Sequence, residues 1–342
     1  MKPRVLKIDP RKIDLSLIKE AARVITGRGL VAFPTETVYG LGANALDPDA
    51  VTGIFEAKRR PLDDPLIVHI SRMEEVHELS GEIPARAEKL LGRFWPGPLT
   101  VVLRKSEKVP DIVTTGLETV AIRMPSNPIA RKLIEVAAVP IAAPSANLFG
   151  RPSPTSASHV IEDLRGRIDL VLDGGKTDIG VESTVVEFME DEVLLLRPGG
   201  IDLEDIRDVL GDTEVTVGAG DEESTPGKYP QHYSPRAAVR VVEPGSRQLD
   251  RALEALSRAR SGGKRVGVMA LAEHAGDFGP FDVKVLGPRD EPRVCASRLF
   301  HILREFDAEK VDVIVAEGIS EKGLGRAVMN RLRKAAGPDL SR

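Results

Sequence analysis

An acidic stretch rich in glycine and proline divides the chain into two halves with different patterns. Residues 201–235 carry 2 Lys or Arg against 9 Asp or Glu and include GDTEVTVGAGDEESTPGKYPQHYSP, a composition typical of a linker. The net charge is −2 over residues 1–200 and +5 over residues 236–342. At about 100–200 residues per domain, 342 residues suffice for two domains. We therefore predict one domain on each side of this linker.

The first half mixes strand-like and helix-like segments in an irregular order. Short apolar runs that read as buried strands are LVAFPT, PLIVHI, LTVVLR, TVAIRM, PIAAP and IDLVLDGG, and STVVEF with EVLLLRPG reads as a hairpin. Helical spacing covers residues 18–26, 50–58, 128–137 and 156–164. This mixture predicts a mixed α/β sheet rather than regular β-α-β alternation.

The second half alternates almost regularly. Strand-like runs at 237–243, 264–271, 281–287 and 311–319 are interleaved with helix-like segments at 249–260, 293–310 and 324–337. Such alternation is typical of a small, parallel, Rossmann-like sheet.

Several classes of protein are excluded by what the sequence lacks. The single cysteine, Cys295, rules out an intramolecular disulfide and a cysteine-rich zinc site. No apolar run approaches the roughly 18 residues of a membrane span, and the start, MKPRVLKIDPRKID, has no signal-peptide apolar stretch. The sequence contains no GxSxG, HExxH or Walker A motif. We expect a soluble protein of the cytoplasm.

Polar residues gather directly after predicted structural elements. The run Pro34–Gly42 follows a strand and offers two threonines, a carboxylate and a phenol for a small polar ligand; the alternative is a helix start capped by Thr35 or Thr37. Lys58, Arg59 and Arg60 follow a helix, where they either complement its dipole or clamp a phosphate. We expect these cations in a polar loop without core packing.

Further candidates lie at other strand ends. Ser145 and Asn147, two residues apart, can face one site. Arg123 lies within a strand-like run and needs a partner such as a ligand carboxylate or phosphate. His69 in a similar position is more often a hydrogen-bonded core residue than a catalyst. Cations and hydroxyls without an obvious nucleophile suit nucleotidyl transfer, in which the substrates supply the nucleophile.

Nine motifs, in this order, resemble those of YrdC-like domains. They are FPTETVYGLG, the K-x-R-P of Lys58–Pro61, PLIVHI, FWPGPLTVVL, VAIRMP, APSANLFGRPSPT, DGG, GVESTVV and LRPG. The stretch PGKYPQHYSP and the tail resemble the long, two-domain threonylcarbamoyl-AMP synthases. The resemblance implies a catalytic domain with a YrdC-like, twisted, mixed α/β sheet at 14–200, a linker or lid at 201–235 and a Rossmann-like domain at 236–342.

The site residues of that family fall on matching positions of this sequence. The resemblance places the catalytic set on Lys58, Arg60, Ser145 and Asn147. It places the threonine-binding set on Thr37, His69, Arg123, Ala143 (through its backbone) and Ser183. It places the nucleotide-binding set on Arg60, Asp64, Thr119, Ser145, Ser153, Arg197 and Tyr233. Arg59 stands where the family usually has glycine, and Asp64 where it often has asparagine.

Three rings close together, Tyr229, His232 and Tyr233, favour a lid over the nucleotide for the second half of the linker. A plain tether gains nothing from rings, whereas a lid uses them to exclude water from labile intermediates. The alternative is that the rings pack the linker onto the first domain.

The resemblance implies synthesis of threonylcarbamoyl-AMP from L-threonine, bicarbonate or CO2, and ATP, with release of pyrophosphate, for threonylcarbamoyladenosine modification of tRNA. It implies Mg²⁺ with ATP, no organic cofactor, no protein-held metal and no membrane. The implied partner is the downstream tRNA threonylcarbamoyltransferase, with tRNA itself a further candidate. The alternatives are an RNA-binding YrdC-like module without synthase activity and a metallocentre-maturing carbamoyltransferase, whose relatives are longer and rich in cysteine.

Overall fold

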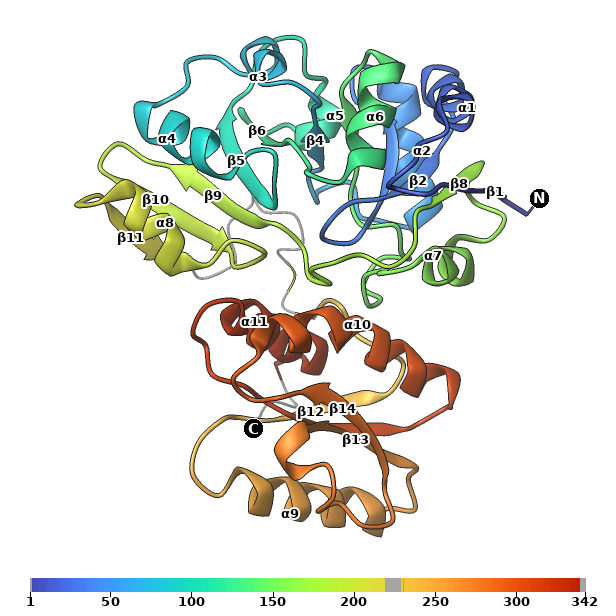
Figure 1. Cartoon of the computed structure of the whole chain (residues 1–342), viewed down its shortest axis with the longest axis vertical. Coiled ribbons are helices and arrows are strands. Elements are labelled where there is room, and N and C mark those ends of the chain that lie inside the picture. Colours follow the sequence, from blue (N-terminus) through green and yellow to red (C-terminus); the bar gives the residue numbers. More distant parts are fainter. Residues whose placement is uncertain (1, 219–228, 230, 339–342) are drawn as a thin grey trace. The chain divides into compact units, whose positions relative to one another are not determined.

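The computed structural model describes residues 2–218, 229 and 231–338, which form two compact units. Unit 1 comprises residues 2–149, 153–178 and 182–218. Unit 2 comprises residues 150–152, 179–181, 229 and 231–338. Each unit is built around its own β-sheet, as Figure 1 shows.

Unit 1 contains an 11-stranded mixed sheet in the order β1-β8-β2-β3-β7-β4-β6-β5-β9-β10-β11. The strands are β1 (Arg4–Lys7), β2 (Val31–Pro34), β3 (Tyr39–Asn44), β4 (Ile67–His69), β5 (Leu99–Arg104), β6 (Thr119–Arg123), β7 (Ile141–Ala142), β8 (Leu170–Asp173), β9 (Thr184–Phe188), β10 (Glu192–Arg197) and β11 (Glu214–Val217). Parallel and antiparallel neighbours alternate irregularly along it, which confirms the predicted mixed sheet.

A tight hairpin joins β2 to β3 where the sequence left a capped helix start as an alternative. The Thr35 hydroxyl accepts hydrogen bonds from the backbone N–H groups of Thr37 and Val38 and donates to Val38 O. The four residues therefore make a turn stabilised by one threonine, and the helix-cap alternative is wrong.

Helices pack on both faces of the first sheet. They are α1 (Leu15–Thr26), α2 (Pro48–Lys58), α3 (Glu74–Leu79), α4 (Ala85–Phe94), α5 (Asp111–Thr114), α6 (Pro128–Ala137), α7 (Ala157–Leu164) and α8 (Leu203–Leu210). Asp47 and Asn127 cap α2 and α6, each directly before a proline, which suits the first helical position. The α1 and α6 helices lie side by side on one face (Figure 1), and α2 and α4 belong to the larger core on the other.

The predicted linker at 201–235 needs correction. Residues 203–210 form α8, and residues 214–217 form β11, which pairs in parallel with β10 at the edge of the first sheet. Leu203, Ile206, Leu210 and Val215 bury their side chains in the larger core. An amphipathic helix and a short strand are therefore present where acidic composition alone indicated a spacer. Residues 219–228 and 230 of the predicted linker lie outside the described residues.

Unit 2 has a four-stranded parallel sheet in the order β12-β15-β13-β14, which confirms the predicted Rossmann-like pattern. Its elements are β12 (Ala238–Val242), α9 (Gln248–Ser261), β13 (Val266–Leu271), the 3₁₀ helix η1 (Ala272–His274), β14 (Asp282–Gly287), α10 (Pro292–Ala308), β15 (Val313–Glu317) and α11 (Gly325–Ala336). The α9 helix covers one face of this sheet, and α10 and α11 cover the other (Figure 1).

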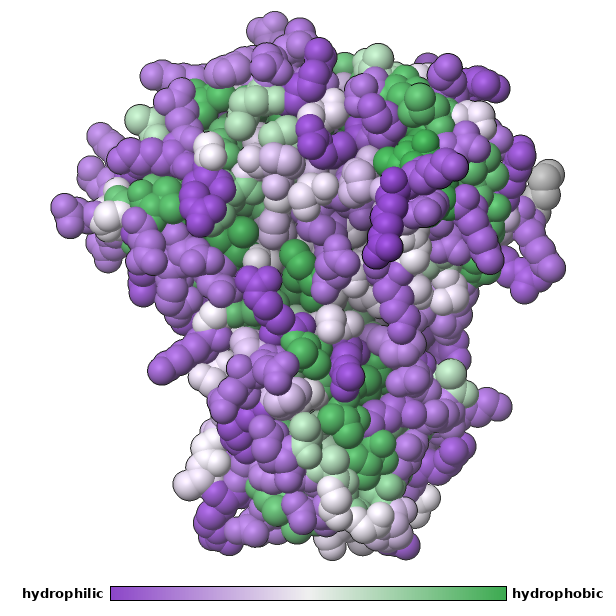
Figure 2. Space-filling view, viewed as in Figure 1, coloured by the Kyte–Doolittle hydropathy of each residue, from purple (hydrophilic) through white to green (hydrophobic). Residues whose placement is uncertain are grey.

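The face of the molecule drawn in Figure 2 is mostly polar. Figure 2 shows hydrophilic side chains over much of the visible face, with hydrophobic ones in small groups between them. The large apolar side chains that are exposed are scattered along the described chain: Val5, Leu15, Leu46, Leu62, Met189, Val217 and Leu253. Within the same residues, no helix has both the length and the apolar character needed to cross a membrane.

Candidate active site

The structure brings three of the four predicted catalytic residues into direct contact. Lys58 lies in the last turn of α2, and its side chain is buried. Its Nζ donates hydrogen bonds to the carbonyl oxygens of Ser145, at 2.5 Å, and Asn147, at 2.7 Å. The backbone N–H of Phe149 donates in turn to Lys58 O, at 2.9 Å. The lysine therefore fixes the path of the loop that carries Ser145 and Asn147.

This burial corrects the expectation that Lys58 lies in a polar loop without packing. Only 1% of Lys58 is exposed, and burial, followed by the nearby charge of Arg60, holds the pKa of its ammonium well below the usual range. Removing the side chain leaves the buried carbonyl of Asn147 and the partly buried carbonyl of Ser145 without their donor. A fully buried carbonyl left in this way costs about 1–3 kcal/mol. The Lys58 side chain thus contributes to the stability of the fold.

Arg60 is buried beside Asp64 in the loop that follows α2. Its guanidinium lies 2.8 Å from the Asp64 carboxylate, and it donates to the carbonyl oxygens of Asp64 and Pro65. Thr119 begins β6, two residues before Ala121, which pairs with Ile67 two residues beyond Pro65. The sheet register therefore places the predicted nucleotide residues Arg60, Asp64 and Thr119 at one end of β4 and β6.

The predicted threonine residues lie at the other end of the same strands. His69 pairs with Arg123 across β4 and β6, and Arg123 pairs with Thr100 across β6 and β5. Because side chains alternate along a strand, these three share the face that carries the small apolar cluster of Ile67, Val102, Ala121, Val185 and Leu196. A row of polar side chains, His69, Arg123 and Thr100, thus lies at one end of this apolar cluster.

Arg123 is held by Glu36, the carboxylate of the run Pro34–Gly42 that the sequence offers for a small polar ligand. Its guanidinium donates to Glu36 Oε1 at 2.7 Å, to Thr37 Oγ1 at 3.0 Å and to Gly97 O at 3.3 Å. Both Arg123 and Glu36 are buried, with 4% and 6% exposed. The partner that a buried arginine needs is therefore present in the chain itself, in the hairpin between β2 and β3.

His69 is a neutral ring in this row. Burial, followed by the positive charge of Arg123, lowers the pKa of His69 to about 3. Its Nδ1 lies 3.2 Å from Ile67 O, so that nitrogen carries the proton as donor. With Nδ1 as the donor, Nε2 carries the lone pair of the neutral ring.

Ser183 links the row to Arg197. The Ser183 hydroxyl lies 2.8 Å from Thr100 Oγ1 and accepts from the Arg197 guanidinium at 3.0 Å, while Arg197 Nε donates to Ser183 O. Ser183 directly precedes β9, whose first residue, Thr184, pairs with Leu99 of β5. A predicted threonine residue and a predicted nucleotide residue thus belong to one hydrogen-bonded network.

The remaining predicted residues of unit 1 follow β7 in the chain, and one of them bridges to β3. Ala143 donates its backbone N–H to Ile67 O at 2.9 Å, and Ser145 forms a bridge with Gly40 of β3. The buried Ser153 donates its hydroxyl to Glu182, a second buried carboxylate that the sequence did not assign. The sequence does hold a clue to this residue, because Glu182 directly precedes the predicted site residue Ser183 in the motif Gly180–Thr184.

Two family models together match nearly the whole chain. One, described as "Telomere recombination", matches residues 23–199, and the other, the threonylcarbamoyl-AMP synthase C-terminal domain, matches residues 201–337. The threonylcarbamoyl-AMP synthase of Pyrococcus abyssi is 53% identical over 331 residues, which cover 95% of this chain and 96% of that protein. The chain belongs to the threonylcarbamoyl-AMP synthase family.

Further relatives agree with this membership. The Bacillus subtilis threonylcarbamoyl-AMP synthase is 48% identical over 324 residues, covering 94% of this chain and 93% of that protein. The crystal structure of Pyrococcus abyssi Sua5 complexed with L-threonine has a TM-score of 0.90 and 49% identity, covering 97% of both chains. A second structure of that protein, in which an adjacent histidine and tyrosine are both changed to alanine, also has a TM-score of 0.90 and 49% identity, and covers 98% of this chain and 96% of that chain.

Tyr233, which the family resemblance assigns to the nucleotide, belongs to unit 2 in the structure. Its ring is 2% exposed and packs against Phe300, with centroids 5.5 Å apart, and under the Arg331 guanidinium at 5.2 Å. His232 stacks edge-on against it at 4.2 Å. These partners of the Tyr233 ring belong to unit 2 and not to the first domain. The lid over a nucleotide stays a prediction.

Arg59, which replaces the usual glycine of the family, adopts a left-handed backbone with φ 54° and ψ 39°. It is the exposed C-cap of α2, a position where glycine avoids a cost of about 1–2 kcal/mol. Arg59→Gly is therefore expected to raise the free energy of unfolding by about 0.5–1 kcal/mol, after the greater freedom of glycine in the unfolded chain is subtracted. Urea denaturation measures this as a higher midpoint with an unchanged slope.

The exposed Arg93 in the last turn of α4 provides the matched control, because its backbone is helical. Arg93→Gly is expected to lower the free energy of unfolding by about 1 kcal/mol. An equal loss in Arg59→Gly would show that the positive φ stores no strain.

The pKa of His69 has a consequence for stability in acid. In the unfolded chain a histidine binds a proton near pH 6.5, whereas in the folded chain the pKa of His69 is about 3. As the pH falls from 6.5 to 4, the unfolded state gains a proton that the folded state refuses, which removes up to about 3 kcal/mol. We expect His69→Asn to lose distinctly less stability than the wild type over this range in urea titrations at several pH values.

His77, exposed on α3, supplies the control, because its ring contacts solvent in both states. If His69→Asn and His77→Asn show the same pH dependence as the wild type, the buried ring is not the source of the acid sensitivity.

Proposed function

We propose that this chain synthesises threonylcarbamoyl-AMP from L-threonine, bicarbonate or CO2, and ATP, with release of pyrophosphate. The observation that carries the proposal is the row of Arg123, His69 and Ser183 at one edge of the sheet, next to the network of Arg197. The product serves threonylcarbamoyladenosine modification of tRNA, through a downstream tRNA threonylcarbamoyltransferase.

Arg123 is suited to hold the carboxylate of threonine although it already has partners. Arginine has five N–H groups, and the bonds to Glu36, Thr37 and Gly97 use three of them. One N–H on each terminal nitrogen remains, which is the pair that binds a carboxylate in a fork. Glu36 and Thr37 thus orient the guanidinium rather than occupy it.

The hydroxyl of threonine then has a natural partner in His69. Thr37 Oγ1 is engaged by Arg123 and lies 2.7 Å from Thr35 Oγ1, so it has little capacity left. The neutral His69 offers Nε2 as an acceptor in a buried setting. We assign the hydroxyl to this nitrogen.

The chemistry needs no nucleophile from the protein. The threonine nitrogen forms a bond to the carbon of CO2 and releases a proton, which gives an N-carboxylate. An oxygen of that group attacks the α-phosphorus of ATP, and the bond to pyrophosphate breaks with its electron pair leaving on pyrophosphate. Positive charge from Arg60 and Arg197 stabilises the reacting phosphates, and Lys58 shapes the loop that carries Ser145 and Asn147.

Magnesium enters with ATP in this proposal. Among the residues that the structure describes, no three His, Cys, Asp or Glu side chains are grouped so as to hold a metal ion. The triphosphate oxygens would therefore supply most of the Mg²⁺ ligands, as is usual for this ion. The ion would offset negative charge on the leaving pyrophosphate.

The test is an assay of pyrophosphate release in which ATP, L-threonine and bicarbonate are omitted one at a time. We expect release only with all three, since each contributes a bond to the product. An RNA-binding module without synthase activity gives no release in any mixture and binds tRNA on filters with a steep salt dependence. Release that continues without threonine would overturn the proposal.

A further inference from the structure

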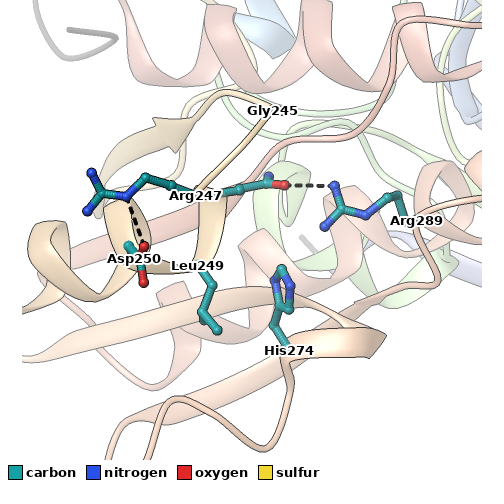
Figure 3. A pocket seen from close by; sticks show the side chains of 7 residues that line it. Gly245, Arg247, Leu249, Asp250, His274 and Arg289 are labelled. Carbon is teal, nitrogen blue, oxygen red and sulfur yellow. Dashed lines mark hydrogen bonds and ion pairs between the residues drawn. The ribbon is translucent and has the colours of Figure 1, made fainter.

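Unit 2 contains a pocket that the proposed reaction does not use. It has a volume of about 280 Å³ and is lined by Gly245, Arg247, Gln248, Leu249, Asp250, His274 and Arg289 (Figure 3). These residues follow three different strands, β12, β13 and β14, at their carboxyl ends. The pocket therefore lies at the edge of a parallel sheet where ligands of such folds usually bind.

The topology of the sheet supports this position. The neighbouring strands β12 and β15 run parallel, but β12 leads into α9 on one face and β15 into α11 on the other (Figure 1). Connections that part in this way leave a crevice beyond the strand ends. Gly245 to Asp250 form the side of the crevice that follows β12.

His274 is held in one orientation by a fully buried carboxylate. Its Nδ1 lies 2.6 Å from Glu317 Oε1 at the end of β15, and the other oxygen of Glu317 accepts the backbone N–H of Leu271. Glu317 is 0% exposed, whereas 19% of the His274 side chain is exposed. With Nδ1 engaged inside, Nε2 is the ring nitrogen that a ligand in the pocket can reach.

Arg289 is positioned from the other side by Gln248. The guanidinium donates to Gln248 Oε1 at 2.9 Å, and the amide nitrogen of Gln248, which is 3% exposed, donates to Val242 O and Gly318 O. Glu273 Oε1 accepts the backbone N–H of Arg289 at 2.8 Å. Figure 3 shows Arg289 and His274 facing the same hollow, while Arg247 turns away toward Asp250.

We infer that this pocket binds the phosphoryl group of a phosphate monoester. The Arg289 guanidinium faces the hollow and is suited to phosphate oxygens. Because His274 Nδ1 donates to Glu317, its Nε2 is an acceptor and takes the hydrogen of a singly protonated phosphoryl group. The first turn of α9 adds backbone N–H groups, and within the described chain no side chain caps it. The volume, near the lower limit of about 300 Å³ for small-molecule sites, suits one phosphoryl group with a small body.

The experiment follows the histidine rings of the full chain, six in all, by two-bond ¹H–¹⁵N correlation spectra during titration with inorganic phosphate. His274→Gln assigns the signal of His274, and His69 reports separately on the candidate active site. We expect the His274 signal to shift and to saturate, with half-saturation at about 1 mM or below. Potassium chloride at equal ionic strength should give no saturation.

Arg289→Gln is expected to raise the half-saturation concentration of phosphate at His274 at least tenfold. Arg258→Gln, which removes an exposed cation farther along α9, should leave it unchanged. A linear shift equal to that in chloride, a shift confined to His69, or an unaltered response in Arg289→Gln would overturn the inference.

A parallel titration with AMP distinguishes the source of the phosphoryl group. Half-saturation below that of inorganic phosphate supports a nucleotide in the pocket, and an equal value supports recognition of the phosphoryl group alone. Binding of AMP more than tenfold weaker than that of phosphate would contradict a monoester.

Discussion

We expect L-2-aminobutyrate in place of L-threonine to lower the rate of pyrophosphate release by about 10⁴-fold at limiting substrate. The two molecules differ by the hydroxyl that we assign to His69. The ring is buried and its pKa is lowered to about 3, so it stays neutral and cannot recover the lost bond by taking up a proton from water. An acceptor left without a donor in a buried site costs far more than the same loss in water.

L-Serine is the matched comparison, because it keeps the hydroxyl and lacks only the methyl group. A missing methyl in an apolar pocket lowers the specificity constant by about 10–200-fold. The expected order is therefore threonine, then serine, then 2-aminobutyrate. Equal rates for serine and 2-aminobutyrate would show that the site recognises volume rather than the hydroxyl.

Arg123→Met is expected to lower both the free energy of unfolding and kcat/KM for threonine. It leaves the buried Glu36 without its counter-ion, which costs about 3–5 kcal/mol of unfolding free energy. It also removes the fork for the threonine carboxylate, and we expect kcat/KM for threonine to fall by about 10²–10³-fold. Urea denaturation and steady-state assays measure the two effects separately.

The double variant Glu36→Gln with Arg123→Met separates these roles. Neutralising Glu36 removes the unpaired buried charge, so the double variant should regain more than half of the lost stability. It should regain none of the lost kcat/KM, because the fork is still missing. Recovery of both quantities would show that Arg123 acts only as a structural partner of Glu36.

Residues beside strand ends could be found from the sequence, but their partners could not. Short apolar runs predicted most central strands, and polar residues within or just after their last positions predicted where His69, Arg123 and Ser145 lie. The contact of Glu36 with Arg123 could not be predicted, because it depends on a hairpin that returns β3 to the sheet, and the same residues also fit a capped helix. Local patterns are ambiguous where the long-range pairing decides.

Lys58 and the segment after residue 200 are two further cases in which the sequence alone did not predict the structure. A lysine at the end of a helix is usually solvated, and its burial follows from carbonyl groups 87 and 89 residues later in the chain. The acidic, glycine-containing segment read as a linker because β11 is four residues long and gains its stability from β10. Composition cannot show a pairing that only the finished sheet provides.

During synthesis, β1 has no partner until β8 has left the ribosome, because Arg4 pairs with Leu170 and Lys7 with Asp173. The pairing of β5 with β9 is also late, since Leu99 pairs with Thr184, although β5 can pair earlier with β6. The hairpin of β2 and β3 can form early, whereas the row that holds Arg123, Thr100 and Ser183 cannot be completed until much later. We therefore expect unit 1 to fold slowly for its size, with nascent strands exposed to premature association.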